Sequence, residues 1–165
     1  MRLALLAALA LATLSACDTS EDEIALPSPT GPSISTSYFP LLPVDFERSG
    51  SVETATYPMP AITREVVTSG LVIAQLDLVG GEDGYFGMPV VVNIDGDLVS
   101  VGYAYAEGEV SATITGPDEV DRASALSGST MKVVAVEPSA AGFASARAAV
   151  EAGEPAAALA ALGVR

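Results

Sequence analysis

Two glycine turns within residues 88–115 constrain the fold more than any other feature of this sequence. Asp95-Gly96 and Glu107-Gly108 each place a glycine where a two-residue hairpin turn requires a positive φ angle. Apolar and polar residues alternate with a period of two around these turns, as in half-buried strands. The segment therefore predicts a three-stranded antiparallel meander. The predicted pairs are Val90 with Val101, Val92 with Val99, Ile94 with Asp97, Val101 with Ile114, Tyr103 with Ala112, and Tyr105 with Val110.

The predicted meander has one apolar face. Because a shift of one residue would turn every apolar side chain outward, the alternation also specifies the register. The opposite face carries polar residues such as Asn93, Ser100 and Thr113, and we expect it to be half-exposed. The side chains predicted to share the apolar face are Val90, Val92, Val99, Val101, Tyr103, Tyr105, Val110, Ala112 and Ile114.

The sequence around the meander predicts further short elements. Strands are expected at 44–46, 52–57, 71–78 and 131–136, and the 71–78 strand is apolar enough to be buried on both faces for part of its length. A short helix is expected at 62–70, where Thr63 can cap the start and Gly70 suits a left-handed position past the end. The expected fold is mainly β, a small antiparallel β-sandwich or meander with one short inserted helix and a short C-terminal helical segment.

The C-terminal helical segment is the alanine-rich stretch 139–165. Phe143, Ala146 and Val150 fall on one helical stripe, Gly153 ends that helix, and Pro155 can open a second one. We expect these helices to close an end or an edge of the sheet. The acidic, serine-rich segment 117–129 shows no period and is expected to be a loop.

The N-terminal residues 1–16 have the composition of a secretory signal peptide. Arg2 supplies the positive charge, and 3–14 is an apolar run too short to span a bilayer. The motif Leu14-Ser15-Ala16-Cys17 follows, and it resembles the lipobox of bacterial lipoproteins, in which the cysteine is diacylated and the signal peptidase cuts before it. The resemblance implies a mature chain that begins at a lipidated Cys17 and is held at a membrane. An ordinary secretory signal with an incidental cysteine is the alternative.

Residues 17–43 are rich in Ser, Thr, Pro and acids, and we expect them to form a disordered tether to a β-rich domain at 44–138. Ser20-Glu21-Asp22-Glu23 resembles the surface-export signal of lipoproteins of the Bacteroidetes group, whereas Asp18 resembles the inner-membrane retention signal of enteric bacteria. A solvated linker without sorting content is the third interpretation. We favour the outer membrane or cell surface over the inner membrane.

Five short motifs follow one another between residues 60 and 136. They are Ile62-Thr63, Gly70-Leu71-Val72-Ile73, Met88-Pro89, Tyr103-Ala104-Tyr105 and Lys132-Val133-Val134. In this order they resemble a small domain found in uncharacterised lipoproteins of the Bacteroidetes group. The resemblance implies a fold and no particular activity.

Charge and composition limit the function. The chain has a net charge of −14 and no histidine, and its only lysine is Lys132. Such an acid excess argues against nucleic acids and anionic membrane surfaces as partners, and it also fits proteins kept soluble in high salt. The absence of histidine removes the commonest general base and metal ligand, and the only thiol, Cys17, is assigned to lipid. We therefore expect a protein that is not an enzyme and has no cofactor.

Two groups of residues are candidates for a binding site. Asn93, Asp95 and Asp97 offer the oxygen ligands that calcium prefers, but turn chemistry explains them without a metal, so we expect no metal site. The aromatic residues of the loop-like contexts can grip a glycan or peptide, or they can fold back on the core. The candidate ligand contacts among them are Tyr38, Tyr85 and Phe86.

Three functions follow from these observations. The leading hypothesis is a lipid-anchored, exported protein with a non-enzymatic structural or binding module. The second is an accessory lipoprotein that binds a glycan or a peptide, with an envelope protein as a further candidate partner. The third is a carboxylate-dependent hydrolase, which requires two acids in one cleft about 5 to 10 Å apart.

Overall fold

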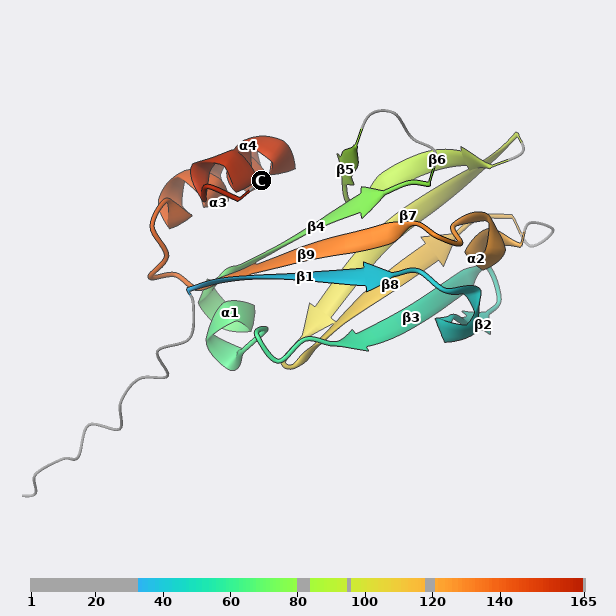
Figure 1. Ribbon diagram of the computed structural model, residues 1–165, viewed down its shortest axis with the longest axis horizontal. Helices are drawn as coiled ribbons and strands as arrows, with labels where there is room; N and C mark the ends of the chain where they lie inside the picture. Colours follow the sequence, from blue (N-terminus) through green and yellow to red (C-terminus); the bar gives the residue numbers. More distant parts are fainter. Residues whose placement is uncertain (1–32, 80–83, 95, 118–120, 165) are drawn as a thin grey trace, which may run out of the picture. The chain divides into compact units, whose positions relative to one another are not determined.

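The computed structural model describes residues 33–79, 84–94, 96–117 and 121–164. Within these residues the predicted fold class is confirmed, because the domain is mainly β, with two antiparallel sheets and short helices (Figure 1). The strands are β1 (Ile34–Pro40), β2 (Glu47–Ser49), β3 (Val52–Pro58), β4 (Leu71–Asp77), β5 (Tyr85–Gly87), β6 (Val90–Ile94), β7 (Asp97–Ala106), β8 (Glu109–Thr115) and β9 (Thr130–Val136). The helices are the 3-10 helix η1 (Pro43–Asp45) and the α-helices α1 (Arg64–Ser69), α2 (Arg122–Ala125), α3 (Phe143–Glu151) and α4 (Pro155–Ala161).

The five-stranded sheet has the order β2-β3-β8-β7-β6 and contains the predicted meander. All six predicted residue pairs occur in the register that the turns require. Gly96 and Gly108 have φ angles of 102° and 82°, which only glycine adopts readily. Asp95, the other residue of the first turn, lies outside the described residues.

The main hydrophobic core lies between the five-stranded sheet and the four-stranded sheet β1-β9-β4-β5. Eight of the nine side chains predicted to share the apolar face of the meander belong to this core or pack against it. Val90, Val99 and Val101 do so from β6 and β7, and Val110 does so from β8. Tyr105 is different, because it lies near the turn at the end of β7 and is exposed. Tyr105 thus has the predicted register, but it does not take part in the core.

The helices α3 and α4 pack on the outer face of the four-stranded sheet (Figure 1). Their buried residues Ala146 and Leu159 belong to a second hydrophobic cluster with Ile73 of β4 and with Val134 and Val136 of β9. Thus β4 is buried on both faces, as predicted. The helices cover a face of the sheet rather than an edge, which corrects the prediction; the reason is that β4 and β9 are apolar on both sides at this end.

The inserted helix α1 begins as predicted, because the Thr63 Oγ1 accepts a hydrogen bond of 3.3 Å from the main-chain N–H of Val66. Gly70 ends the helix with φ of −82°, so the predicted left-handed conformation was wrong. A Cβ at this position would collide with the main chain of Val136 and Val66. Glycine is needed here for close approach of the backbones rather than for its φ angle.

The N-terminal boundary of the domain differs from the prediction. Residues 34–40, expected to lie in the tether, form β1, which pairs with β9 over its whole length. Its Ser and Thr residues and Pro40 are tolerated because β1 is an edge strand. The predicted strand at 44–46 is instead η1, and the predicted loop at 117–129 contains α2.

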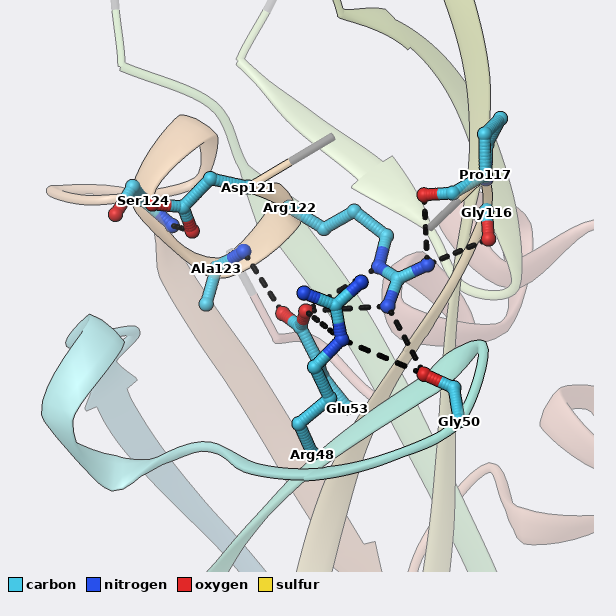
Figure 2. A network of polar contacts seen from close by, with 9 residues as sticks. All are labelled: Arg48, Gly50, Glu53, Gly116, Pro117, Asp121, Arg122, Ala123 and Ser124. Atoms are coloured by element: carbon cyan, nitrogen blue, oxygen red, sulfur yellow. Dashed lines mark hydrogen bonds and ion pairs between the residues drawn. The ribbon is translucent and has the colours of Figure 1, made fainter. Parts of the chain in front are cut away.

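The helix α2 is fastened to β3 by a buried ion pair (Figure 2). Arg122 is fully buried, and its Nη2 lies 3.2 Å from Oε1 of Glu53, which is also buried. Arg122 Nη1 also donates to the carbonyl of Pro117 at 2.9 Å, and the N–H of Ala123 donates to the other carboxylate oxygen, Oε2, at 3.0 Å. This network stabilises the segment between β8 and β9.

Candidate functional site

The outer face of the four-stranded sheet is covered by α3 and α4 over only part of its length. The sheet register aligns Ile73 with Val134 beneath the helices. On the same face, two residues further along each strand, the next row consists of Tyr38, Lys132, Gln75 and Gly87. The row after it consists of Pro40, Thr130, Asp77 and Tyr85. The composition of the face therefore changes from apolar to polar and aromatic within one step of the strands.

Two exposed tyrosines flank this polar part of the face. Tyr38 on β1 is 54% exposed, and Tyr85 on β5 is 41% exposed. The strands β1 and β5, which carry these tyrosines, are three positions apart in the strand order. Because neighbouring strands lie about 4.8 Å apart, β1 and β5 are separated by about 14 Å. Phe39, next to Tyr38, stacks on Tyr57 with ring centroids 5.0 Å apart. The fold thus brings together two of the three predicted ligand contacts, from opposite edges of one sheet.

Lys132 and Gln75 lie between the two tyrosines. Lys132 is only 2% exposed, and its Nζ lies 5.2 Å from the centroid of the Tyr85 ring. This is within the range of a cation–π interaction, which orients the ring over the ammonium group. Gln75 is likewise buried. We call the set Tyr38, Gln75, Asp77, Tyr85 and Lys132 the tyrosine face.

The electrostatics of the tyrosine face favour a protonated phenol at Tyr85. Desolvation is the main cause that raises the pKa of Tyr85 above its ordinary value, and the charges of Asp77 and Tyr38 add to this shift. At neutral pH the Tyr85 phenol is therefore protonated and offers a hydroxyl for hydrogen bonding.

Phe86, the third predicted ligand contact, does not lie on the tyrosine face. Successive residues of a strand point to opposite faces, and Phe86 is paired with Leu76, which is fully buried in the core between the sheets. Phe86 is half-buried on that side.

Sequence reasoning missed Lys132, Gln75 and Asp77 as parts of a site. A signal was present, because Lys132 and Gln75 are polar residues inside otherwise apolar strands. Polar residues are retained in such buried positions only where they have partners. What the sequence alone did not supply was the register that places Lys132 opposite both Gln75 and Tyr38.

The other predicted site residues are not brought together with the tyrosine face. Asn93 Oδ1 accepts a hydrogen bond of 2.9 Å from the N–H of Gly96, which is the turn chemistry expected of this residue. Asp97 begins β7 and is exposed, whereas Asp95 and Cys17 lie outside the described residues. Within the part of the chain that the structure describes, no three acidic, histidine or cysteine residues are grouped so that they can hold a metal ion.

Glu53 is the one buried acid among the residues that the structure describes. Both of its oxygens are occupied, one by Arg122 and the other by the N–H of Ala123 (Figure 2). A general acid or base must reach its substrate within hydrogen-bond distance. The geometry of Glu53 is therefore that of a structural carboxylate.

No family model, curated protein or solved structure matches this chain. No helix within residues 33–79, 84–94, 96–117 and 121–164 is long and apolar enough to cross a membrane.

Proposed function

We propose that this chain is an exported, lipid-anchored protein of the cell envelope whose domain binds a glycan at the tyrosine face and does not turn it over. The observation that carries the binding proposal is the position of Tyr38 and Tyr85, two exposed tyrosines on the same uncovered part of one sheet face. This proposal combines the leading hypothesis, a non-enzymatic module, with the second hypothesis, an accessory glycan-binding lipoprotein.

The chemistry of the face supports a sugar as the ligand. A tyrosine ring offers an apolar surface for the C–H groups of a sugar, and its hydroxyl offers a hydrogen bond. Asp77, which is half-buried at the end of β4, adds a carboxylate, which suits the hydroxyls of a neutral sugar. A net charge of −14 makes a strongly anionic glycan an unfavourable ligand.

The proposed location depends on the N-terminal motifs. The lipobox-like Leu14-Ser15-Ala16-Cys17 supports attachment to the membrane through acyl chains on Cys17. The serine and acids at residues 20–23 support the outer membrane or cell surface as the destination. We also propose kinship with the lipoproteins of the Bacteroidetes group that share the order of motifs described above.

A glycan array followed by calorimetry tests the proposal. The full chain carrying Cys17→Ser, which needs no detergent, is applied to an array of bacterial and host polysaccharides, and the strongest ligand is titrated. Tyr38→Ala and Tyr85→Ala should each weaken binding by about 2- to 10-fold, since an aromatic contact contributes about 0.5 to 1.5 kcal/mol.

Tyr105→Ala is the matched control, because Tyr105 is 40% exposed but lies on the other sheet. It should leave glycan affinity unchanged. Equal losses for all three variants, or no glycan bound at all, would reject the proposal. Tyrosine-dependent retention of a peptide library without any glycan binding would replace the glycan by a peptide.

A further inference from the structure

The domain contains a cavity of about 420 Å³ outside the tyrosine face. It lies between β4, the connection from β5 to β6, and the turn that joins α3 to α4. Its walls include Val72, Ile73, Met88, Tyr103, Val150 and Pro155.

The cavity follows from the shortness of β5. β5 pairs with β4 only at Gln75–Asp77, and the chain then leaves the sheet after the N–H of Met88 has bonded to the carbonyl of Ala74 at 3.0 Å. Among the residues that the structure describes, no strand therefore lies beside the edge of β4 at Leu71–Ile73 on this side. The turn between α3 and α4 bridges the gap, and Pro155 packs against Gly87 so closely that a Cβ on Gly87 would collide with it.

The walls are mainly apolar. Tyr103 is one of the lining residues. Its hydroxyl donates a hydrogen bond of 2.8 Å to the carbonyl of Val72, so the polar end of this side chain already has a partner. The remaining side chains named above are aliphatic, a thioether or a proline ring. No charged residue is among the described residues that line the cavity, so an ion that entered it would lose its hydration without a compensating charge from them.

We propose that this cavity binds a small, uncharged, mainly apolar molecule, such as one with an aromatic ring or a short acyl chain. Its volume lies in the range of 300 to 1,000 Å³ or so that is usual for small-ligand sites. A cavity bounded on three sides by β4, the β5–β6 connection and the α3–α4 turn fits a small molecule rather than a folded partner. The proposal is independent of the glycan site, because the cavity shares no side chain of the tyrosine face.

Fluorescence titration with the neutral probe N-phenyl-1-naphthylamine tests the proposal. The full chain carrying Cys17→Ser should bind one equivalent of the probe and enhance its emission. Val150→Trp places a large ring in the cavity and should weaken probe binding at least tenfold. The probe is excited beyond the absorption of tryptophan, so the new ring does not contribute to the signal.

Val67→Trp is the matched control, because Val67 is an exposed valine of α1 that does not line the cavity. It should bind the probe as the parent does, and so should Tyr38→Ala. If Val150→Trp does not unfold cooperatively, the smaller change Val150→Phe takes its place and should give a smaller but measurable loss. Absence of probe binding to the parent, or equal binding by the Val150 variants, would overturn the proposal.

Discussion

Glu53 and Arg122, which are 69 positions apart in the sequence, meet in a buried ion pair that joins β3 to α2. Removal of one partner of such a pair typically costs about 3 to 5 kcal/mol, because the remaining charge stays buried without compensation. Arg122→Met replaces the charged side chain by an unbranched apolar one. We expect it to lower the free energy of unfolding by up to this amount, because Arg48, with its Nε 3.7 Å from Oε1 of Glu53, and the N–H of Ala123 remain as partners of the carboxylate. Chemical denaturation measures the change.

The control for this prediction is Arg147→Met. Arg147 forms an i,i+4 ion pair of 3.1 Å with Glu151 on the exposed side of α3, and exposed pairs contribute at most about 1 kcal/mol. Similar losses for Arg122→Met and Arg147→Met would mean that burial does not strengthen the Glu53–Arg122 pair.

The turn at Gly96 supports a second prediction. Its φ angle of 102° is strained for a β-branched residue, so Gly96→Val should destabilise the domain by about 1 to 3 kcal/mol. Gly96→Asn should cost less, because asparagine tolerates positive φ better than valine does. Thermal unfolding of both variants gives the comparison. A valine variant as stable as the asparagine variant would contradict the turn conformation.

The anchor provides a third prediction. Cys17→Ser removes the proposed attachment point for the acyl chains, and the protein should then appear in the soluble fraction without detergent. Fractionation of cells that express the parent or the variant is the measurement. An unchanged membrane fraction for Cys17→Ser would reject lipidation at this cysteine.

The raised pKa of Tyr103 leads us to predict a loss of stability at alkaline pH. Burial is the main cause that raises its pKa above the ordinary value of 10.0; the neighbouring Tyr105 adds to the shift, and a main-chain hydrogen bond from Ala74 opposes it. A group with a raised pKa in the folded state contributes stability that is complete below its unfolded pKa and is lost as pH rises through the folded pKa. The free energy of unfolding should therefore fall above pH 10 or so, where the unfolded phenol ionises first.

Tyr103→Phe tests this dependence. It should cost about 1 kcal/mol at neutral pH, since the carbonyl of Val72 loses its donor, and should flatten the decline above pH 10 or so. Tyr38→Phe, at an exposed tyrosine, is the control and should follow the parent. Denaturant titrations at pH 8 and pH 11 supply the data, and identical slopes for parent and Tyr103→Phe would contradict the prediction.

The parts of the fold that the sequence predicted correctly depend on local chemistry. The turns at Gly96 and Gly108 fix the register of β6, β7 and β8 because strand alternation and turn type act on neighbouring residues. The strand β1 was missed for the opposite reason. Its Ser and Thr residues carry no period, and it forms by pairing with β9, almost a hundred residues later.

In the candidate site, too, the local features were predicted and the non-local ones were missed. Tyr38 and Tyr85 were each predicted as ligand contacts, but their common face depends on the strand order β1-β9-β4-β5. That order places Lys132 between them, and a non-local pairing of this kind leaves no local trace in the sequence. Phe86 was assigned with Tyr85 because the two are adjacent, and the alternation of β5 separates them.

The direction of β1 also determines which end of the four-stranded sheet lies near the point where the chain enters the domain. The chain enters the domain at Ile34, beside the part of the sheet that α3 and α4 cover, and Tyr38 follows four residues later, about 13 Å further along the strand. The two tyrosines therefore lie away from the end of the sheet at which the chain enters, on the part that the helix pair leaves uncovered.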